Sequence, residues 1–402
     1  MTESSSLSPK SPPLIPIEFV TEEEMSLIDA ALAATTSSLS SRSSPCSYSF
    51  PSSPSSSSQF QRNGRSVESI TFYSKRKLSV CSETESLRTR DIEDFGEFKG
   101  TQKKLKVLEG FLHRFRRKRG LAITDITATE WCEKQMEFVL LRGKPKDSEA
   151  MKAGKARHTK LEEEVLKKVE VRVEAAEDAW AVKFMNFIAG AHQLLFEGLT
   201  RELPLIGFVE GVWMVGVIDE IRMPATDTVR NPLLVETKTR TQASLPAEPQ
   251  KRNGRLQLMC YKYLWDNAVT DNFHSSRFFT SFGLNPHYIL SEEIQKHTAS
   301  SGFPAKTLED LVTFFKNTCC MLPPAHDQLL LRYEFQGDDS LLGEEHFLYD
   351  PIWLMSRIKQ RLEFWLGERE AGYVPPEERW KCQTCKFASI CPSNTTADGK
   401  SS

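Results

Sequence analysis

The chain has 402 residues, a formal net charge of −2, 39 % hydrophobic residues and a mean hydropathy of −0.40. It is therefore no polycation, and any binding of nucleic acid would require a local basic surface. No apolar run is long enough to span a membrane, and the N-terminus lacks the basic and apolar regions of a secretory signal, so we expect neither a membrane span nor secretion.

Much of the polarity lies near the N-terminus. Residues 37–58 include 14 serines, and such a segment cannot bury enough apolar surface to offset the entropy lost on folding. We expect a disordered serine-rich tail over residues 1–95, one folded domain over residues 96–392 and a disordered end over residues 393–402. The targeting signals are weak, with a short basic cluster at residues 75–77, and we expect the nucleus, with the mitochondrion and the plastid as alternatives.

The folded part begins with helical patterns and continues with short apolar runs that are typical of strands. The expected helices cover residues 103–119, a segment that starts at Thr127 with a capping-box pattern, and residues 150–175, 179–199, 257–265, 308–317 and 351–366. The expected strands cover residues 202–208, 212–222 and 233–239, and a loop with proline and glycine is expected at residues 246–254. This order predicts an α/β fold with helical additions.

The most informative pattern places acidic residues at strand ends, followed by a lysine. Asp219 and Glu236 each follow an apolar run. Glu236 and Lys238 share one face of a strand, and Asp219 can reach that face from the neighbouring strand. Two carboxylates suit Mg²⁺ or Mn²⁺, and a nearby lysine can stabilise developing charge, which together fit phosphodiester cleavage. Glu-x-Lys alone is more often a surface ion pair, but a carboxylate in an apolar strand is costly without a partner.

Two helices carry further candidates. His158 and Glu162 lie one helical turn apart, and the histidine could ligate a metal or be an ordinary surface residue. Gln257 and Tyr261 have the same spacing, and they could support Lys238, contact a nucleotide or simply belong to a half-buried helix.

A group of cysteines lies near the C-terminus. Cys382, Cys385 and Cys391 have the spacing C-x₂-C-x₅-C, which suits a metal ion or an iron–sulfur cluster. Such a site needs a fourth ligand, and Cys132, beside Trp131, is the best candidate. Zinc and a cluster fit four thiolates equally well, whereas a disulfide is less favoured in a chain without a secretory signal.

Together these motifs resemble the exonuclease V family and the RecB/AddB nucleases of the PD-(D/E)xK superfamily. The resemblance covers residues 95–392. Its carriers are Glu130-Trp131-Cys132-Glu133, Gly154 to His158, Glu177 to Phe184, Val215 to Glu220, Glu236 to Arg240, Gln257 to Tyr261 and the C-terminal cysteines. It implies a restriction-endonuclease-like PD-(D/E)xK core with helical additions and a C-terminal cysteine cluster.

The resemblance also implies a Mg²⁺-dependent (or Mn²⁺-dependent) exonuclease with a [4Fe–4S] cluster, acting on single-stranded DNA in repair or genome maintenance. The implied roles are metal binding for Asp219, Glu236 and His158, catalysis for Lys238 with the two acids, substrate binding for Gln257 and Tyr261, and cluster ligation for Cys132, Cys382, Cys385 and Cys391. We expect a monomer, with a single-strand-binding protein as a candidate partner. The alternative is an inactive nucleic-acid-binding repair scaffold with a zinc- or cluster-stapled nuclease fold.

Three basic stretches are candidate tracks for a DNA strand, because such tracks pair with phosphates. They are residues 114–119, then Lys152, Lys155 and Arg157, and finally Arg240 with Lys251, Arg252 and Arg255. Solvated surface charge is an equally good interpretation of each.

Overall fold

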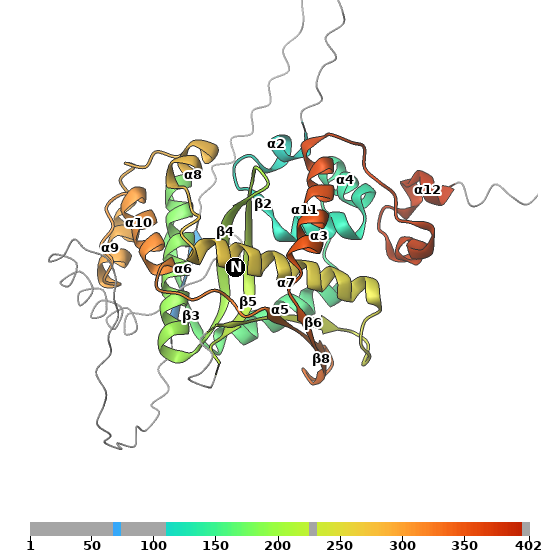
Figure 1. Cartoon of the computed structure of the whole chain (residues 1–402), viewed down its shortest axis with the longest axis horizontal. Helices are drawn as coiled ribbons and strands as arrows, with labels where there is room; N and C mark the ends of the chain where they lie inside the picture. Colours follow the sequence, from blue (N-terminus) through green and yellow to red (C-terminus); the bar gives the residue numbers. More distant parts are fainter. Residues whose placement is uncertain (1–66, 74–109, 225–230, 396–402) are drawn as a thin grey trace, which may run out of the picture.

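A computed structural model of the chain describes residues 67–73, 110–224 and 231–395 (Figure 1). The serine-rich segment, the basic cluster at residues 75–77 and most of the expected tail lie outside the described residues, as do residues 396–402. One part of the expected tail forms a strand, in contrast to the expectation of disorder. This strand, β1 (Val67–Tyr73), pairs in parallel with β3 (Leu166–Arg172). Its three β-branched and two aromatic residues suit a strand.

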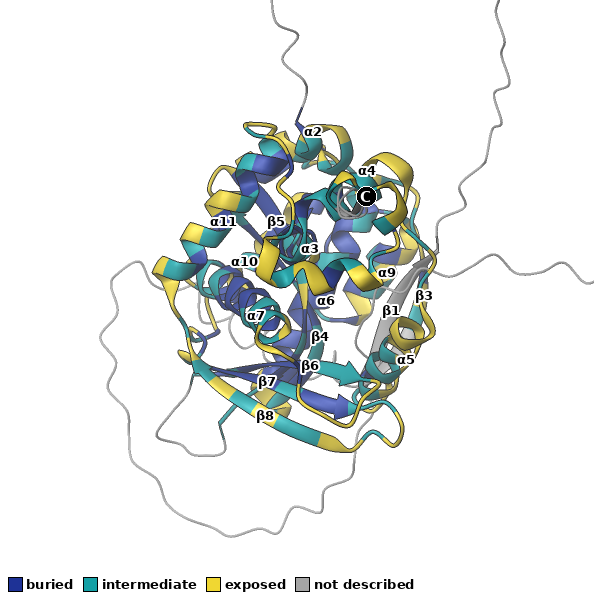
Figure 2. Cartoon of the chain, turned by 90° about the vertical axis from the view of Figure 1, so that its right-hand side faces the viewer, coloured by how far each residue is buried: buried dark blue, intermediate teal, exposed yellow. Residues whose placement is uncertain are grey.

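A mixed six-stranded sheet forms the centre of the fold. Its strands are β2 (Leu121–Ala122), β4 (Leu199–Val209), β5 (Val212–Arg222), β6 (Leu233–Arg240), β7 (Gln328–Phe335) and β8 (Leu341–Leu348). β5 pairs with antiparallel β4 along its length, with parallel β2 near its start and with antiparallel β6 at its end. Parallel β7 and antiparallel β8 complete the order, and β8 is the exposed edge (Figure 2). The mixed α/β fold expected from the sequence is confirmed.

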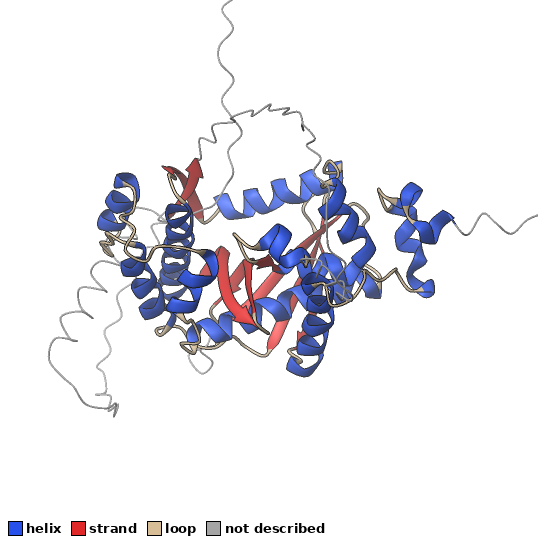
Figure 3. Ribbon diagram, turned by 90° about the horizontal axis from the view of Figure 1, so that it is seen from above, coloured by secondary structure: helices blue, strands red, loops and turns tan. Residues whose placement is uncertain are grey.

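Helices lie on both sides of the sheet (Figure 3). Before β6 they are α2 (Phe111–Arg116), α3 (Ile123–Trp131), α4 (Glu133–Arg142), α5 (Glu149–Glu163) and α6 (Ala176–Glu197). After β6 they are α7 (Glu248–Val269), α8 (Ser275–Phe282), α9 (Glu292–Ser300), α10 (Leu308–Cys319), α11 (Pro351–Leu366), the 3₁₀ helices η1 (Pro376–Thr384) and η2 (Ala388–Ile390), and α12 (Pro392–Thr395). None of the described helices is long and apolar enough to cross a membrane.

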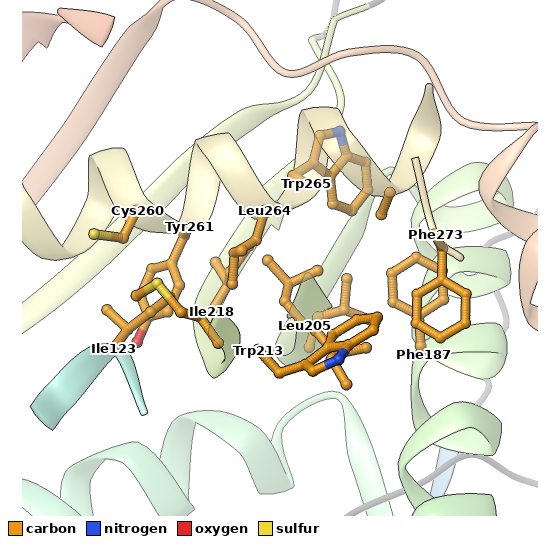
Figure 4. Close-up of a cluster of buried hydrophobic side chains, with 14 of the residues drawn as sticks. Ile123, Phe187, Leu205, Trp213, Ile218, Cys260, Tyr261, Leu264, Trp265 and Phe273 are labelled. Carbon is orange, nitrogen blue, oxygen red and sulfur yellow. The ribbon is translucent and has the colours of Figure 1, made fainter. Parts of the chain in front are cut away.

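α7 crosses the sheet and contacts β4, β5, β6 and β7 (Figure 1). The approach is close, because a Cβ added to Gly216 of β5 would lie 2.5 Å from the Tyr261 ring and 2.8 Å from Ile123. Figure 4 shows these two side chains next to each other below α7. Large buried aromatic residues, among them Trp213 and Phe273 with ring centres 5.5 Å apart, fill the space between the sheet, α6 and α7. This packing fixes α7 against the sheet.

The hairpin of β4 and β5 and the partial pairing of β5 with β6 together position the site. Glu210 and Gly211 join β4 to β5 with φ angles of 46° and 82°, as the two central residues of a type I′ turn require. β5 and β6 are paired only where residues 220–222 face residues 233–235. The strands separate beyond this short ladder, and we call the point of separation the β5–β6 fork.

Three expected elements differ from the structure. The helix expected over residues 150–175 ends at Glu163 and is followed by β3, because valines at every second position from residue 169 favour a strand. The loop expected at residues 246–254 belongs largely to α7, since Pro249 is tolerated in a first turn, where no N–H bond is lost. The helix expected to start at Thr127 already starts at Ile123, where Asp125 accepts a hydrogen bond from the Ala122 amide.

Other expected elements are confirmed with small shifts. Strand 212–222 and helix 351–366 have the expected bounds, while the helix expected over residues 103–119 is described only from residue 110 and forms α2. The strands β7 and β8 and the helices α4, α8 and α9 are additions to the expected pattern.

Candidate active site

The β5–β6 fork brings the two predicted acidic residues together. Glu220 pairs with Val235, so Asp219 and Glu236 are the first residues beyond the last paired position. The backbone N–H of Thr237 donates a 2.8 Å hydrogen bond to Oδ2 of Asp219, which ties the two strands together at this point. Glu236 is almost completely buried, and its Oε2 atom has no hydrogen-bond partner. A buried carboxylate oxygen without a partner is costly and therefore indicates a missing cation or donor.

Lys238 extends from the same face of β6 as Glu236. Its Nζ lies 2.5 Å from Oε1 of Glu236 and donates a 2.9 Å hydrogen bond to Oε1 of Gln257. The amide nitrogen of Gln257 in turn donates to Oε1 of Glu236 at 2.7 Å and to the Tyr261 hydroxyl at 3.0 Å. Gln257 of α7, itself bonded to Tyr261, thus holds Lys238 and Glu236 in fixed positions.

His158 reaches the fork from α5. Its Nδ1 lies 3.4 Å from Oε1 of Glu202 and 3.6 Å from Oδ1 of Asp219. One ligand atom from each of these three residues lies within 4.8 Å of the ligand atoms of the other two. α5 is held in this place at Gly154, where an added Cβ would lie 3.1 Å from Oγ1 of Thr239.

Glu202 is the site residue that the sequence analysis missed. It stands on β4 opposite Asp219, because the ladder pairs Arg201 with Glu220 and Leu203 with Ile218. Its φ angle of 51° lies in the left-handed region, which costs energy for a residue with a side chain and occurs most often at functional sites. The sequence contains a signal for this position of Glu202. A two-residue turn at Glu210 and Gly211 fixes the pairing of β4 with β5, and this register places residue 202 opposite residue 219.

The electrostatics of the fork show an excess of negative charge. Burial raises the pKa of Asp219 and of Glu236, and the neighbouring carboxylates raise both further. Burial disfavours the charged form of His158, but Glu202 and Asp219 outweigh this and raise the pKa of the imidazole to about 9. Lys238 is partly shielded from solvent, which disfavours its charged form, but the two carboxylates outweigh this and raise its pKa. Such a cluster is suited to a cation.

All six predicted residues of this region line one cavity of about 450 Å³. They are His158, Asp219, Glu236, Lys238, Gln257 and Tyr261. The cavity continues from the acidic residues past β4 and β5 to an aromatic wall on α6. Its size and its mostly apolar walls with a few convergent polar groups are those of a ligand site.

The four predicted cysteine ligands also come together. Cys132, Cys382, Cys385 and Cys391 line one small cavity between the start of α4 and the segment of η1 and η2. Gln135 links two of them, because its backbone N–H donates to Cys132 and its side chain to Cys385, at 3.4 and 3.6 Å. All seven cysteines of the described residues are free thiols, so the described part of the chain has no disulfide.

Comparison with known proteins gives matches over the part of the chain that contains both sites. A profile described as "Exonuclease V - a 5′ deoxyribonuclease" matches residues 110–233, 224–311 and 293–392. The chain belongs to the exonuclease V family. Exonuclease V of Danio rerio is 30 % identical over 329 residues, which cover 79 % of this chain and 81 % of that protein. The resemblance that the motifs indicated is confirmed, and membership of the exonuclease V family identifies the chain as a nuclease.

Proposed function

We propose that this member of the exonuclease V family degrades single-stranded DNA from the 5′ end by hydrolysing phosphodiester bonds with Mg²⁺ or Mn²⁺. The observation that carries the proposal is the β5–β6 fork, where a buried carboxylate oxygen of Glu236 without a partner faces a group of further ligands. The choice of DNA and the 5′ direction come from the description of the family, and the choice of single strands comes from the resemblance of the sequence motifs. A role in DNA repair would follow from such an activity.

The residues at the fork fit a hard divalent cation. Carboxylate oxygens are the ligands that Mg²⁺ and Mn²⁺ prefer, and imidazole is compatible with Mn²⁺. Asp219 and Glu236 would hold the ion from the two strands, with Glu202 and His158 beside them. When bound, the ion polarises the phosphate and lowers the pKa of a bound water.

Lys238 acts on the charge that develops during hydrolysis. Its ammonium is held by Glu236 and Gln257 and still exposes 38 % of the side chain towards the cavity. From this position it can orient the attacking water and stabilise the extra negative charge on the phosphate oxygens. Gln257 of α7, itself bonded to the Tyr261 hydroxyl, keeps the lysine in place, and both side chains line the cavity in which they would also contact the DNA.

We also propose that the four cysteines hold a [4Fe–4S] cluster. Their side chains converge on one cavity from the two ends of the folded part, and soft thiolates are the ligands that such clusters require. A cluster there would fasten the C-terminal segment to α4.

The proposal is tested with Asp219→Asn and Lys238→Met on end-labelled single-stranded DNA with Mg²⁺. Both variants should lower kcat by about 100-fold or more, since Asp219→Asn removes a ligand of the metal ion and Lys238→Met removes the group that acts on developing charge. Glu292→Gln on α9 is the matched control, because its carboxylate is 84 % exposed and lies outside the cavity. Wild-type rates in Asp219→Asn would overturn the proposal. Strands blocked at one end or the other report the direction, and binding by the wild type without turnover would support an inactive scaffold instead.

A further inference from the structure

The cavity that contains the β5–β6 fork holds a second lysine, which the catalytic argument does not use. Lys183 belongs to α6 and lines the aromatic part of the cavity together with Trp180 and Phe184. Its Nζ lies 4.0 Å from the centre of the Trp180 ring. Trp180 is itself buried and packs edge-on against Phe278, with ring centres 5.0 Å apart. The lysine is therefore held in a defined position on a rigid helix.

Lys183 has no negative partner. Within the described residues no carboxylate forms an ion pair or a hydrogen bond with its ammonium, and the charge that acts on it is that of another cation, Arg119. Burial and then Arg119 lower the pKa of Lys183 to about 8. An ammonium in a mostly apolar cavity without a counter-ion is costly, and an anionic ligand would remove this cost.

A basic surface leads from solvent to this lysine. The turn between α2 and β2 carries Arg117, Lys118 and Arg119, all of them exposed. β2 follows at once, and residues 122–124 line the cavity. Arg119 lies 3.9 Å from Asp125 and stays largely exposed, so the turn keeps most of its positive charge.

The two other candidate tracks are largely neutralised by ion pairs. In the second, Arg157 pairs with Glu334 at 2.7 Å and Lys155 with Asp147 at 2.5 Å. In the third, Arg252 pairs with Glu378 at 2.8 Å. The turn before β2, with Lys183 behind it, is thus a basic stretch that keeps more of its charge available to phosphates than these two tracks do.

We propose that Lys183 binds a backbone phosphate of the DNA strand inside the cavity, beside the phosphate that is cleaved at the fork. The strand enters past the turn of residues 117–119, and a base rests against the apolar wall of residues 204–206 and 215–217. Single-strand binders combine these two features, positive charge along the backbone and apolar surface for bases. The subsite rests on the proposed function, because it assigns the substrate of the same cavity.

The test measures the salt dependence of binding. Two full-length proteins are compared, both carrying Asp219→Asn to stop cleavage and one of them also carrying Lys183→Met. Their affinity for a labelled oligothymidylate is measured between low and moderate salt. Loss of one phosphate contact should lower the slope of log Kd against log salt by about 0.7 and raise Kd at low salt by about fivefold to tenfold. Lys183→Arg should restore the slope. Lys160→Met on α5 is the control, because that lysine is 65 % exposed and paired with Asp339.

Two further readouts separate substrate binding from structural support. In the active protein, Lys183→Met should raise KM by a similar factor and leave kcat within about threefold. Its melting temperature should equal or exceed that of the wild type, since a partly buried charge without a counter-ion is removed. An unchanged slope and Kd, or a lower melting temperature with an unchanged KM, would overturn the subsite. A wild type that binds DNA but fails to cleave it would overturn only the proposed function, because the slope of log Kd against log salt would still show whether Lys183 contacts a phosphate.

Discussion

Glu202 shows how a single residue connects backbone geometry with the charge of the site. Its carboxylate lies 3.4 Å from the imidazole of His158, and its φ angle of 51° is one that glycine adopts more easily. The residue therefore carries a cost in the fold that only a function of its side chain would explain.

Two substitutions at this position separate the charge from the strain. Glu202→Gln and Glu202→Gly should both raise the Mg²⁺ concentration needed for half-maximal cleavage by about tenfold, because one anionic ligand is lost. Glu202→Gly should be the more stable of the two by about 1 kcal/mol, since it also relieves the left-handed backbone. Cleavage rates against Mg²⁺ concentration and thermal melting check both statements. A wild-type Mg²⁺ requirement in both variants would show that Glu202 lies outside the metal site.

Gln257 is the second residue whose effect can be isolated. It accepts from Lys238 and donates to Glu236 and Tyr261. Gln257→Ala should lower kcat by about 10-fold to 100-fold with KM within threefold, because the lysine loses one of its two anchors. The control is Gln250→Ala, an exposed glutamine on the same helix. A change in KM alone would point to substrate binding instead of positioning.

At the scale of elements, the close contact between β5 and α7 holds the site together. Gly216 leaves only enough room for the Tyr261 ring and for Ile123 of α3. Gly216→Ala should destabilise the protein by about 1–3 kcal/mol, because the buried Tyr261 ring and the end of the Ile123 side chain must both move. Gly254→Ala is the matched control on α7: its added Cβ would meet the flexible end of Leu331 at 3.2 Å, and alanine favours a helix. Chemical denaturation measures both, and equal stability of the two variants would contradict the packing argument.

The elements that the sequence predicted well are those with a clear period. β5 and α11 have the expected bounds because an apolar run or an amphipathic stripe covers their whole length. β7 contains the apolar run Leu329 to Leu331, a local signal that the sequence analysis did not use. The edge strand β8 escaped prediction because its residues face solvent and bear a mixed pattern, and only its antiparallel pairing with β7 marks it as a strand. A local periodic pattern gives no information about which strands pair with each other. The same limit explains why Lys238 was found from its own strand, whereas Glu202 required a register between two strands.

At the scale of the whole molecule, the cysteine site joins segments from the two ends of the described core. Cys385→Ser and Cys132→Ser should lose the visible absorbance of an iron–sulfur cluster and make the segment after α11 more sensitive to proteases. Cys320→Ser is the control, because this cysteine is exposed and lies outside the small cavity. Stoichiometric zinc without visible absorbance in the wild type would identify the other metal, and unchanged protease resistance in both variants would contradict the fastening role.

The sequence predicted this convergence of the cysteines by spacing and by the position of Cys132, and the structure brings all four to one cavity. It could not predict the arginines that surround the neighbouring Glu133, which accepts two hydrogen bonds from Arg369 at 2.5 and 2.7 Å and one from the backbone N–H of Gly372 at 2.8 Å. Arginines occur throughout the chain, and nothing in their spacing indicates which of them meet one carboxylate.

The β5–β6 fork also sets a limit on how the protein can adapt to heat. Three unfavourable features meet there. The backbone at Glu202 is strained, the carboxylates of Asp219 and Glu236 repel each other, and one buried oxygen of Glu236 has no hydrogen-bond partner. Replacement of these residues by neutral ones would make the empty protein more stable, so selection for heat resistance alone would remove the site first. A heat-resistant relative that keeps its activity must therefore gain its stability elsewhere, in the aromatic core or along the exposed edge of β8.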